Sequence, residues 1–156
     1  MSKSLKRVEA EAKALGLLLE IIREDVVTTT AQMAADARGC GVDQIVKSIL
    51  FRKQGSERHV LFLTAGGNRV SQAKAEAACG YALSRADAAS IRAYSGFAIG
   101  GVSPLGHLNP VTKFMDPSLM DYPIIWAAAG TPNHVFAIDP AVLAEKTAAY
   151  VVDFTE

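Results

Sequence analysis

The sequence is poor in cysteine and carries no net charge. Cys40 and Cys79 are its only cysteines and form no CxxC pair, so we expect reduced thiols rather than a disulfide framework or a structural zinc site. Sixteen basic side chains balance sixteen acidic ones. This balance excludes a general nucleic-acid coat, because sequence-independent affinity for nucleic acid comes largely from neutralised phosphates. Any RNA footprint is therefore expected to be small.

Long apolar runs and the common catalytic motifs are also missing. No apolar run approaches the roughly 20 residues of a membrane span, and residues 1–7 lead into a charged amphipathic segment rather than a signal peptide. We therefore expect a cytoplasmic protein with no membrane partner. The chain has no H-E-x-x-H metal motif, no G-x-S-x-G elbow and no Ser-His-Asp order. The sequence thus predicts no metal ligands, no cofactor and no protein nucleophile.

What is present is the composition of a globular domain. The 156 residues are 50% hydrophobic and 21% charged, which is enough to bury a core and too apolar for a disordered chain. We expect residues 1–156 to form a single domain. No internal repeat or linker interrupts it.

Short helices and short strands are expected to alternate along the chain. The threonines at 28–30 form a strong N-cap cluster, and Ser4, Ser71, Asp87 and Asp139 are further candidate caps. Helices are expected at 5–15, 31–38, 71–79, 87–94 and after 139–140, and strands at 17–22, 45–53, 59–65, 81–83, 111–115, 124–129, 134–138 and 150–154. The hairpin of 45–65 makes part of the sheet antiparallel, so we predict an α+β fold with a mixed sheet.

Two stretches stand out as candidate site segments. Residues 96–107 hold four glycines and Pro104, and their bare amides, with the Ser103 hydroxyl, could cradle a phosphate, a carboxylate or an oxyanion. A glycine-rich turn between strands is the alternative. Lys47 interrupts the apolar strand 45–51, where it either points into a pocket or lies on a solvated face.

These two stretches carry a family resemblance. The run Gly100-Gly101-Val102-Ser103-Pro104-Leu105-Gly106 resembles the signature of the YbaK/EbsC family, the free-standing relatives of the editing insertion of prolyl-tRNA synthetase, and 43–51 resembles the family's lysine segment. The likeness spans about residues 28–153. It implies a mixed, mainly antiparallel sheet that is curled and barrel-like, with peripheral helices. It also implies an aminoacyl-tRNA deacylase whose partner is the 3′ end of a charged tRNA. An aminoacyl-tRNA synthetase, on which the deacylase would dock, is a second candidate partner.

The resemblance assigns roles to individual residues. In the family the lysine anchors the tRNA end, loop amides hold the carbonyl, and a ribose hydroxyl or a substrate thiol assists or makes the attack. The implied catalytic residues are Lys47, Gly101 and Ser103, and the implied substrate-binding residues are Thr28, Ser48, Gly100, Val102, Pro104, Gly130 and His134.

A purely structural role is the alternative for several of these positions. Helix capping is the alternative for Thr28 and the favoured role of Asp116, and a strand-edge histidine is the alternative for His134. His107, which stands where the cysteine-specific branch has glutamine, is a weaker candidate, and His59 is expected on the hairpin surface.

The activity that the resemblance implies is removal of a small amino acid from mischarged tRNA. Alanine, serine, cysteine and 2-aminobutyrate are candidates, on tRNA(Pro) or a related tRNA, although His134 departs from the cysteine-specific pattern. Two other hypotheses stay open. The chain could be a non-catalytic module that binds a nucleotide or a tRNA end, or a module that docks on a synthetase.

Overall fold

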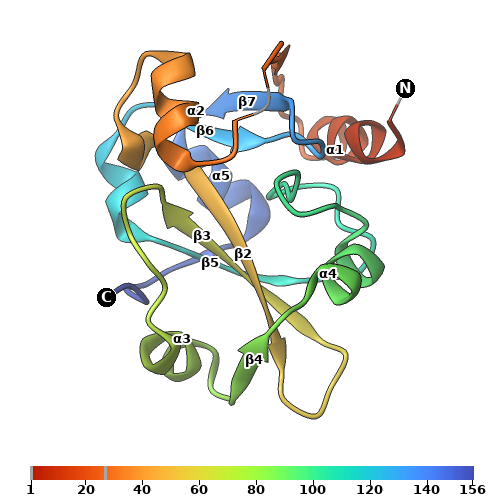
Figure 1. Ribbon diagram of the computed structural model, residues 1–156, viewed down its shortest axis with the longest axis vertical. Coiled ribbons are helices and arrows are strands. Elements are labelled where there is room, and N and C mark those ends of the chain that lie inside the picture. The colour runs from red at the N-terminus through yellow and green to blue at the C-terminus, as the bar shows by residue number, and fades with distance from the viewer. Residues whose placement is uncertain (1, 27) are drawn as a thin grey trace.

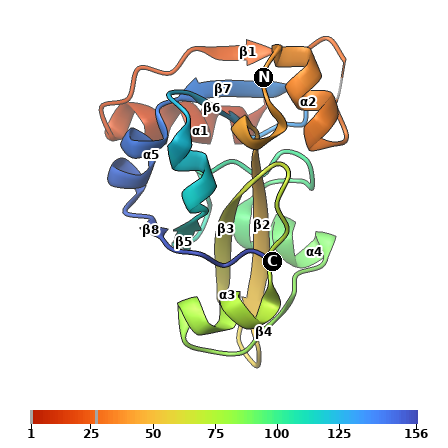
Figure 2. The same cartoon turned by 90° about the vertical axis from the view of Figure 1, so that its left-hand side faces the viewer.

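The computed structural model describes residues 2–26 and 28–156. Two β-sheets with helices packed around them form an α+β fold, as the sequence predicts. Figures 1 and 2 show the smaller sheet at one end of the molecule, with strands β2 and β3 running from it toward α3 and β4 at the other end. None of the helices in this part of the chain is long and apolar enough to cross a membrane.

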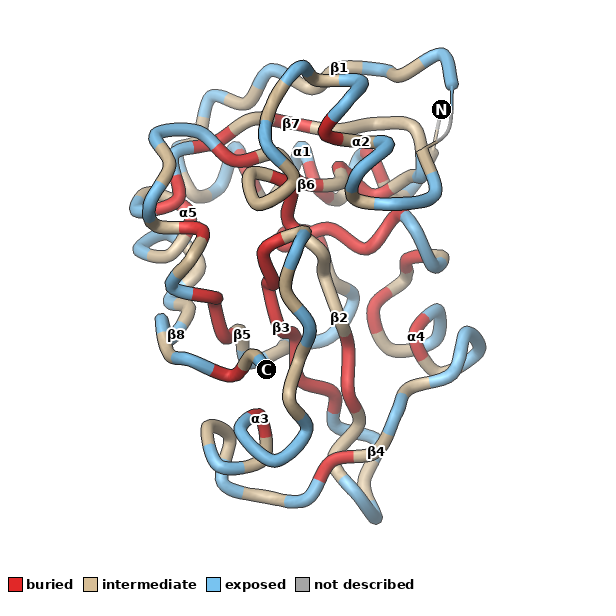
Figure 3. The backbone as a smooth tube through the Cα atoms, turned by 60° about the vertical axis from the view of Figure 1, so that its left-hand side comes forward, coloured by how far each residue is buried: buried red, intermediate tan, exposed pale blue. Residues whose placement is uncertain are grey.

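The larger sheet has five strands in the order β4-β2-β3-β5-β8. Its centre is the expected hairpin, made of β2 (Val46–Lys53) and β3 (His59–Ala65), and β3 is buried along its whole length (Figure 3). The outer strand β4 (Leu83–Arg85) pairs antiparallel to β2. On the other side β5 (Thr112–Met115) and β8 (Tyr150–Val151) are parallel.

The smaller sheet is antiparallel and has the order β1-β7-β6. It is made of β1 (Ile21–Arg23), β6 (Ile125–Ala128) and β7 (His134–Ile138). An isolated parallel bridge between Ile45 and Trp126 joins it to the beginning of β2.

The prediction of a curled, barrel-like sheet is wrong. The described strands form two separate open sheets, although four of their six pairings are antiparallel and the larger sheet is mixed. The larger sheet ends at β4 and β8, which pair over only three and two residues. Edges this short do not continue into a closed sheet, and β1 pairs with β7 instead of extending either of them.

Local signals placed most helices correctly. The helices are α1 (Lys3–Ala14), α2 (Ala31–Arg38), α3 (Gln72–Cys79), α4 (Ala88–Ser95) and α5 (Pro140–Thr147), with short 3₁₀ turns η1 (Val42–Gln44) and η2 (Pro117–Asp121). The expected caps Ser71, Asp87 and Asp139 each accept a backbone N–H of the first turn. The expected cap of α1 is wrong, since Ser2 caps it and the Ser4 hydroxyl instead donates to Gly96 O at 3.2 Å.

The strands at the two ends of the chain are shorter than expected, and β4 is shifted. Of the strand predicted at 17–22, only the last two residues pair with another strand, as part of β1. Leu17 and Leu19 pack on the core without a strand partner, and Leu18 is exposed to solvent. The predicted strand at 81–83 forms two residues later, and 150–154 pairs only at 150–151.

Two apolar clusters sit on the two faces of the β2–β3 hairpin. One joins Leu50, Leu61 and Leu63 to α1, α5 and the smaller sheet, and the other packs aromatic rings such as Phe62 and Phe154 under α3. His59 belongs to this interior, contrary to expectation. It is 1% exposed because its ring stacks on Tyr94 at 4.5 Å.

Candidate active site

A hollow of about 400 Å³ lies where the two sheets meet. Because β4 pairs with β2 only from Phe51 onward, the first half of β2 has an open edge toward this hollow. The wall is completed by the glycine loop, the smaller sheet and the beginning of α2. Its polar and loop residues are Glu24, Thr28, Thr29, Thr30, Arg38, Lys47, Ser48, Gly100, Thr131 and His134, and its apolar ones include Ile45, Ile49, Ile99, Val102, Trp126 and Pro132.

Lys47 lies in the pocket wall and not on a solvated face. Its ammonium donates to the main-chain oxygen of Asn68. A lysine has three N–H donors, and within residues 2–26 and 28–156 it has no second acceptor, so two donors remain for a ligand. Burial lowers the pKa of Lys47, and the Arg69 charge lowers it further, whereas the carboxylates of Asp116 and Asp43 act in the opposite direction.

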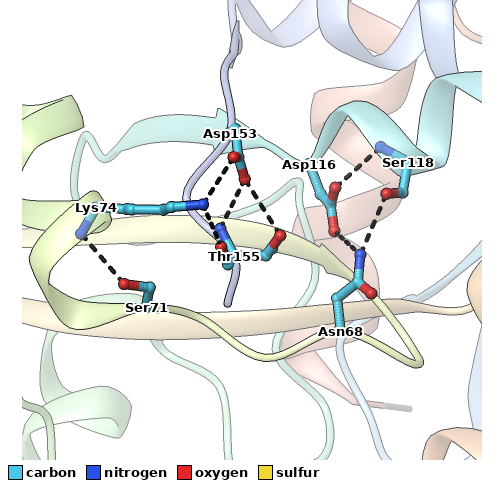
Figure 4. A network of polar contacts seen from close by, with 7 residues as sticks. All are labelled: Asn68, Ser71, Lys74, Asp116, Ser118, Asp153 and Thr155. Atoms are coloured by element: carbon cyan, nitrogen blue, oxygen red, sulfur yellow. Dashed lines mark hydrogen bonds and ion pairs between the residues drawn. The ribbon is translucent and has the colours of Figure 1, made fainter.

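The turn that carries Asn68 is held by two aspartates. Buried Asp116 accepts hydrogen bonds from Ala65 N at 3.0 Å and Asn68 Nδ2 at 2.9 Å (Figure 4). It also accepts Ser118 N at 2.9 Å, so its expected capping role is confirmed. From the other side, Asp43 accepts Gly67 N at 2.8 Å. The carbonyl that receives Lys47 is therefore fixed by groups from β3, η1 and the beginning of η2.

Gly66 is required in this turn by close packing. A Cβ on Gly66 would lie 2.2 Å from Val42 O, a contact that no side chain can make without a shift of the backbone. The turn thus approaches η1 more closely than any other residue would permit.

The glycine loop contributes only part of its length to the pocket. Gly100 and Val102 line the wall, and their amides donate to no acceptor in the part of the chain that the structure describes. The amide of Gly101 is already used, because it donates to Ala98 O at 3.0 Å. Among the residues of this loop that line the hollow, Gly100 and Val102 therefore have unpaired amides, as does Ile99, whereas the amide of Gly101 is occupied.

Ser103 and Pro104 lie behind the pocket wall and are buried. The Ser103 hydroxyl accepts Leu105 N at 3.2 Å, and its carbonyl accepts His107 Nε2–H at 2.6 Å. These contacts fold the loop. The Ser103 hydroxyl is thus engaged within the loop, and Ser103 does not line the hollow.

The second turn, 130–134, brings His134 to the pocket. Thr131 Oγ1 donates to Asn133 Oδ1 at 3.1 Å and lies 2.5 Å from His134 Nδ1. With its own proton given to Asn133, Thr131 accepts the Nδ1–H of His134, which leaves Nε2 as an acceptor. Gly130 does not line the hollow, since a Cβ there would lie 2.8 Å from Ser4 O of α1.

Thr28 and Ser48 also line the hollow. The cap of α2 is Thr30, whose hydroxyl accepts Met33 N at 3.1 Å, so Thr28 is not needed as a cap. Ser48 Oγ is buried and has no hydrogen-bond partner among the residues described. Six of the site residues predicted from sequence line this pocket: Thr28, Lys47, Ser48, Gly100, Val102 and His134. The other four do not line it: Gly101, Ser103, Pro104 and Gly130.

Sequence reasoning missed a charged and aromatic group at the mouth of the pocket. The Arg38 guanidinium lies 5.3 Å from the Trp126 ring and 2.7 Å from a Glu24 oxygen. Trp126 is the single tryptophan of the chain, which was a signal in itself. Its contact with Arg38 joins two distant parts of the chain and could not be read from spacing.

Fold and pocket together define a class of protein: an α+β domain with a hollow where its two sheets meet, lined by a lysine, a histidine and loop residues with unpaired amides. The chain belongs to the aminoacyl-tRNA editing domain family, whose model matches residues 25–146. The resemblance to the YbaK-type editing proteins is thereby confirmed.

Individual proteins resemble the chain over nearly its whole length. A solved structure described as a "putative trans-editing enzyme for prolyl tRNA synthetase" is 39% identical, with a TM-score of 0.92, and covers 100% of this chain and 99% of its own. A structure from work on epitope grafting onto scaffold proteins is 38% identical, with a TM-score of 0.93 and the same coverage. The uncharacterized protein YwhH of Bacillus subtilis (strain 168) is 25% identical over 142 residues, which are 91% of this chain and 90% of that protein.

Proposed function

We propose that the protein is a trans-acting aminoacyl-tRNA deacylase, with residues 1–156 acting as one editing domain in the cytoplasm. One observation carries this proposal: a lysine with unused ammonium donors and loop residues with unpaired amides line the same hollow. Hydrolysis of an aminoacyl ester needs an anchor for the terminal nucleotide and donors for the carbonyl oxyanion. The hollow supplies both kinds of group.

Each pocket residue has a part in the proposed reaction. Lys47 holds the phosphate or ribose of the terminal adenosine, and the amides of Gly100 and Val102 receive the oxyanion. Loss of one such oxyanion donor costs about 10²–10³ in rate in other enzymes. Thr28, Ser48 and His134 shape the wall around the amino acid, while Gly101, Ser103, Pro104 and Gly130 hold the two loops in place behind it.

The attacking group is proposed to be water assisted by a ribose hydroxyl of the substrate. Such assistance makes a protein nucleophile unnecessary. The bond between the ester carbonyl carbon and the ribose oxygen breaks, water supplies the hydroxyl of the released amino acid, and the ribose oxygen takes up the proton.

The substrate is proposed to be a tRNA that carries a small amino acid such as alanine, serine, cysteine or 2-aminobutyrate. The description of the 39% identical relative supports tRNA(Pro) as the carrier and prolyl-tRNA synthetase as the enzyme whose errors are corrected. One methylene changes such a discrimination by only about 1–3 kcal/mol. Direct comparison of substrates is therefore needed to choose among these amino acids.

The test is deacylation of a panel of mischarged tRNA(Pro) species carrying these four amino acids, each with a terminal adenosine or its 2′-deoxy form. We expect rapid hydrolysis of at least one aminoacyl ester, and a much lower rate when the terminal adenosine is 2′-deoxy. Equal rates for the adenosine and 2′-deoxyadenosine forms would refute the ribose-assisted mechanism. Tight binding of tRNA with no hydrolysis at high enzyme concentration would instead indicate a binding module without catalytic activity.

A further inference from the structure

Helix α1 lies outside the matched residues 25–146, yet its side chains contact both ends of the glycine loop; Figure 1 shows where the helix lies in the fold. Arg7 makes the principal contact. Its Nε donates to Gly106 O at 2.9 Å and its Nη2 donates to Gly96 O at 2.8 Å. A single planar guanidinium therefore joins the two carbonyls between which the loop runs.

Other groups of α1 support the same connection. The Ser4 hydroxyl donates to Gly96 O, and the Glu11 carboxylate accepts the amide of Gly106. The Arg7 guanidinium also lies 5.2 Å from the ring of Phe97, which is fully buried. Since Leu5, Val8 and Ala12 anchor α1 in the core, these contacts tie the loop to a fixed support.

The outer glycines of the loop are explained by α1 and not by a ligand. A Cβ on Gly96 would lie 2.4 Å from Arg7 Nη2, and a Cβ on Gly106 would lie 2.7 Å from Val8 N. Both positions also have a positive φ. A side chain at position 106 would force the loop away from the backbone of α1, and one at position 96 would displace the Arg7 guanidinium.

Lys47 is held independently of this arrangement. Its partner Asn68 is fixed by Asp116, and neither residue contacts Arg7. The anchor for the tRNA end and the amides for the carbonyl thus have separate supports, so one can be disturbed without the other.

We propose that Arg7 is a positioning residue: by holding the carbonyls of Gly96 and Gly106 it sets where the amides of Gly100 and Val102 lie in the pocket, and thereby the rate of the chemical step. This inference rests on the proposed deacylase function. Arg7 does not line the hollow, so it acts through the loop. Because Lys47, the proposed tRNA anchor, has a separate support, loss of the Arg7 guanidinium should change kcat and leave KM for the tRNA nearly unchanged.

The kinetic test compares Arg7→Met with Lys6→Met, a matched loss of an exposed cation one residue earlier on α1. Misplacement of a reacting group by about 1 Å can cost about 10²-fold. We expect Arg7→Met to lower kcat about 10- to 100-fold with KM changed less than about threefold, and Lys6→Met to match the wild type. Arg7→Lys, which lacks the planar fork, should restore part of kcat. A raised KM with unchanged kcat would overturn the proposal.

A second measurement keeps this inference separate from the proposed function. Amide hydrogen exchange over residues 97–105 needs no substrate, and we expect Arg7→Met to accelerate it at unchanged exchange in β3. If the wild type hydrolyses no ester, the deacylase proposal fails and the exchange experiment alone decides the role of Arg7. Unchanged exchange in the loop of Arg7→Met would overturn the positioning role of Arg7. If Arg7→Met does not fold, the same measurement on Arg7→Lys decides.

Discussion

His107 should make the protein sensitive to mild acid. Its Nε2–H donates to Ser103 O, and its Nδ1 is buried with no partner in the described chain. Burial lowers the pKa of His107 from its ordinary 6.5 to about 4; the bond to Ser103 opposes this shift, and the charges of Lys113 and Arg7 add to it. Protonation would place a cation beside two others inside the loop that shapes the pocket.

The sign and size of the effect follow from proton linkage. The unfolded chain binds a proton on His107 below pH 6.5, whereas the folded chain does so only below about pH 4. Between these values the unfolded state holds more protons, so the stability that His107 contributes is complete above pH 6.5 and is lost as the pH falls toward 4. At about 1.4 kcal/mol per pKa unit, the loss is about 3 kcal/mol.

The assay is urea unfolding of the wild type and of His107→Gln at several pH values between about 7 and 4. Glutamine keeps an N–H that can donate to Ser103 O but takes up no proton. The difference in unfolding free energy between the two proteins should shift by about 3 kcal/mol in favour of the variant as the pH falls. Parallel pH dependences would refute the account of His107 as a buried neutral group.

Two further substitutions test the supports of the site. Asp116→Ala removes the acceptor of three donors, of which Ala65 N is buried. A buried donor left unpaired costs about 1–3 kcal/mol, so urea unfolding should show a loss of at least about 1 kcal/mol, with slower deacylation by the protein that still folds; unchanged stability would contradict this expectation. Gly101→Ala puts a Cβ 3.0 Å from the backbone of Thr131, so deacylation should fall about tenfold, while Gly41→Ala, whose Cβ meets only Gln44 Oε1 at 3.7 Å, should match the wild type. Equal activity of the two glycine variants would show that the loop tolerates displacement.

Sequence predicted the parts of the fold that local chemistry determines. Ser71, Asp87 and Asp139 begin helices because a side-chain oxygen satisfies an amide two or three residues later. The hairpin of β2 and β3 likewise depends on neighbouring strands joined by a short turn. Sequence could not predict that β1 pairs with β7 or that β5 pairs with β8 at one edge of the larger sheet, because these pairings join distant segments.

The candidate site shows the same division. The family motifs located Lys47 and the glycine loop, but spacing alone could not tell which amides of the loop are free. Gly101 donates to Ala98 O within the loop, and the outer glycines meet α1. Glycine content therefore indicated a special backbone correctly, while the reason for each glycine needed three-dimensional packing.

The most direct test of the central claim is single-turnover deacylation by wild type, Lys47→Ala and Lys53→Ala on the most reactive mischarged tRNA(Pro). Lys53 lies on the same strand as Lys47 but outside the hollow, with its ammonium 4.8 Å from the Tyr81 ring. The account predicts that Lys47→Ala abolishes rapid deacylation while remaining folded, and that Lys53→Ala keeps the wild-type rate. Rapid deacylation by Lys47→Ala would contradict the assignment of this pocket as the active site.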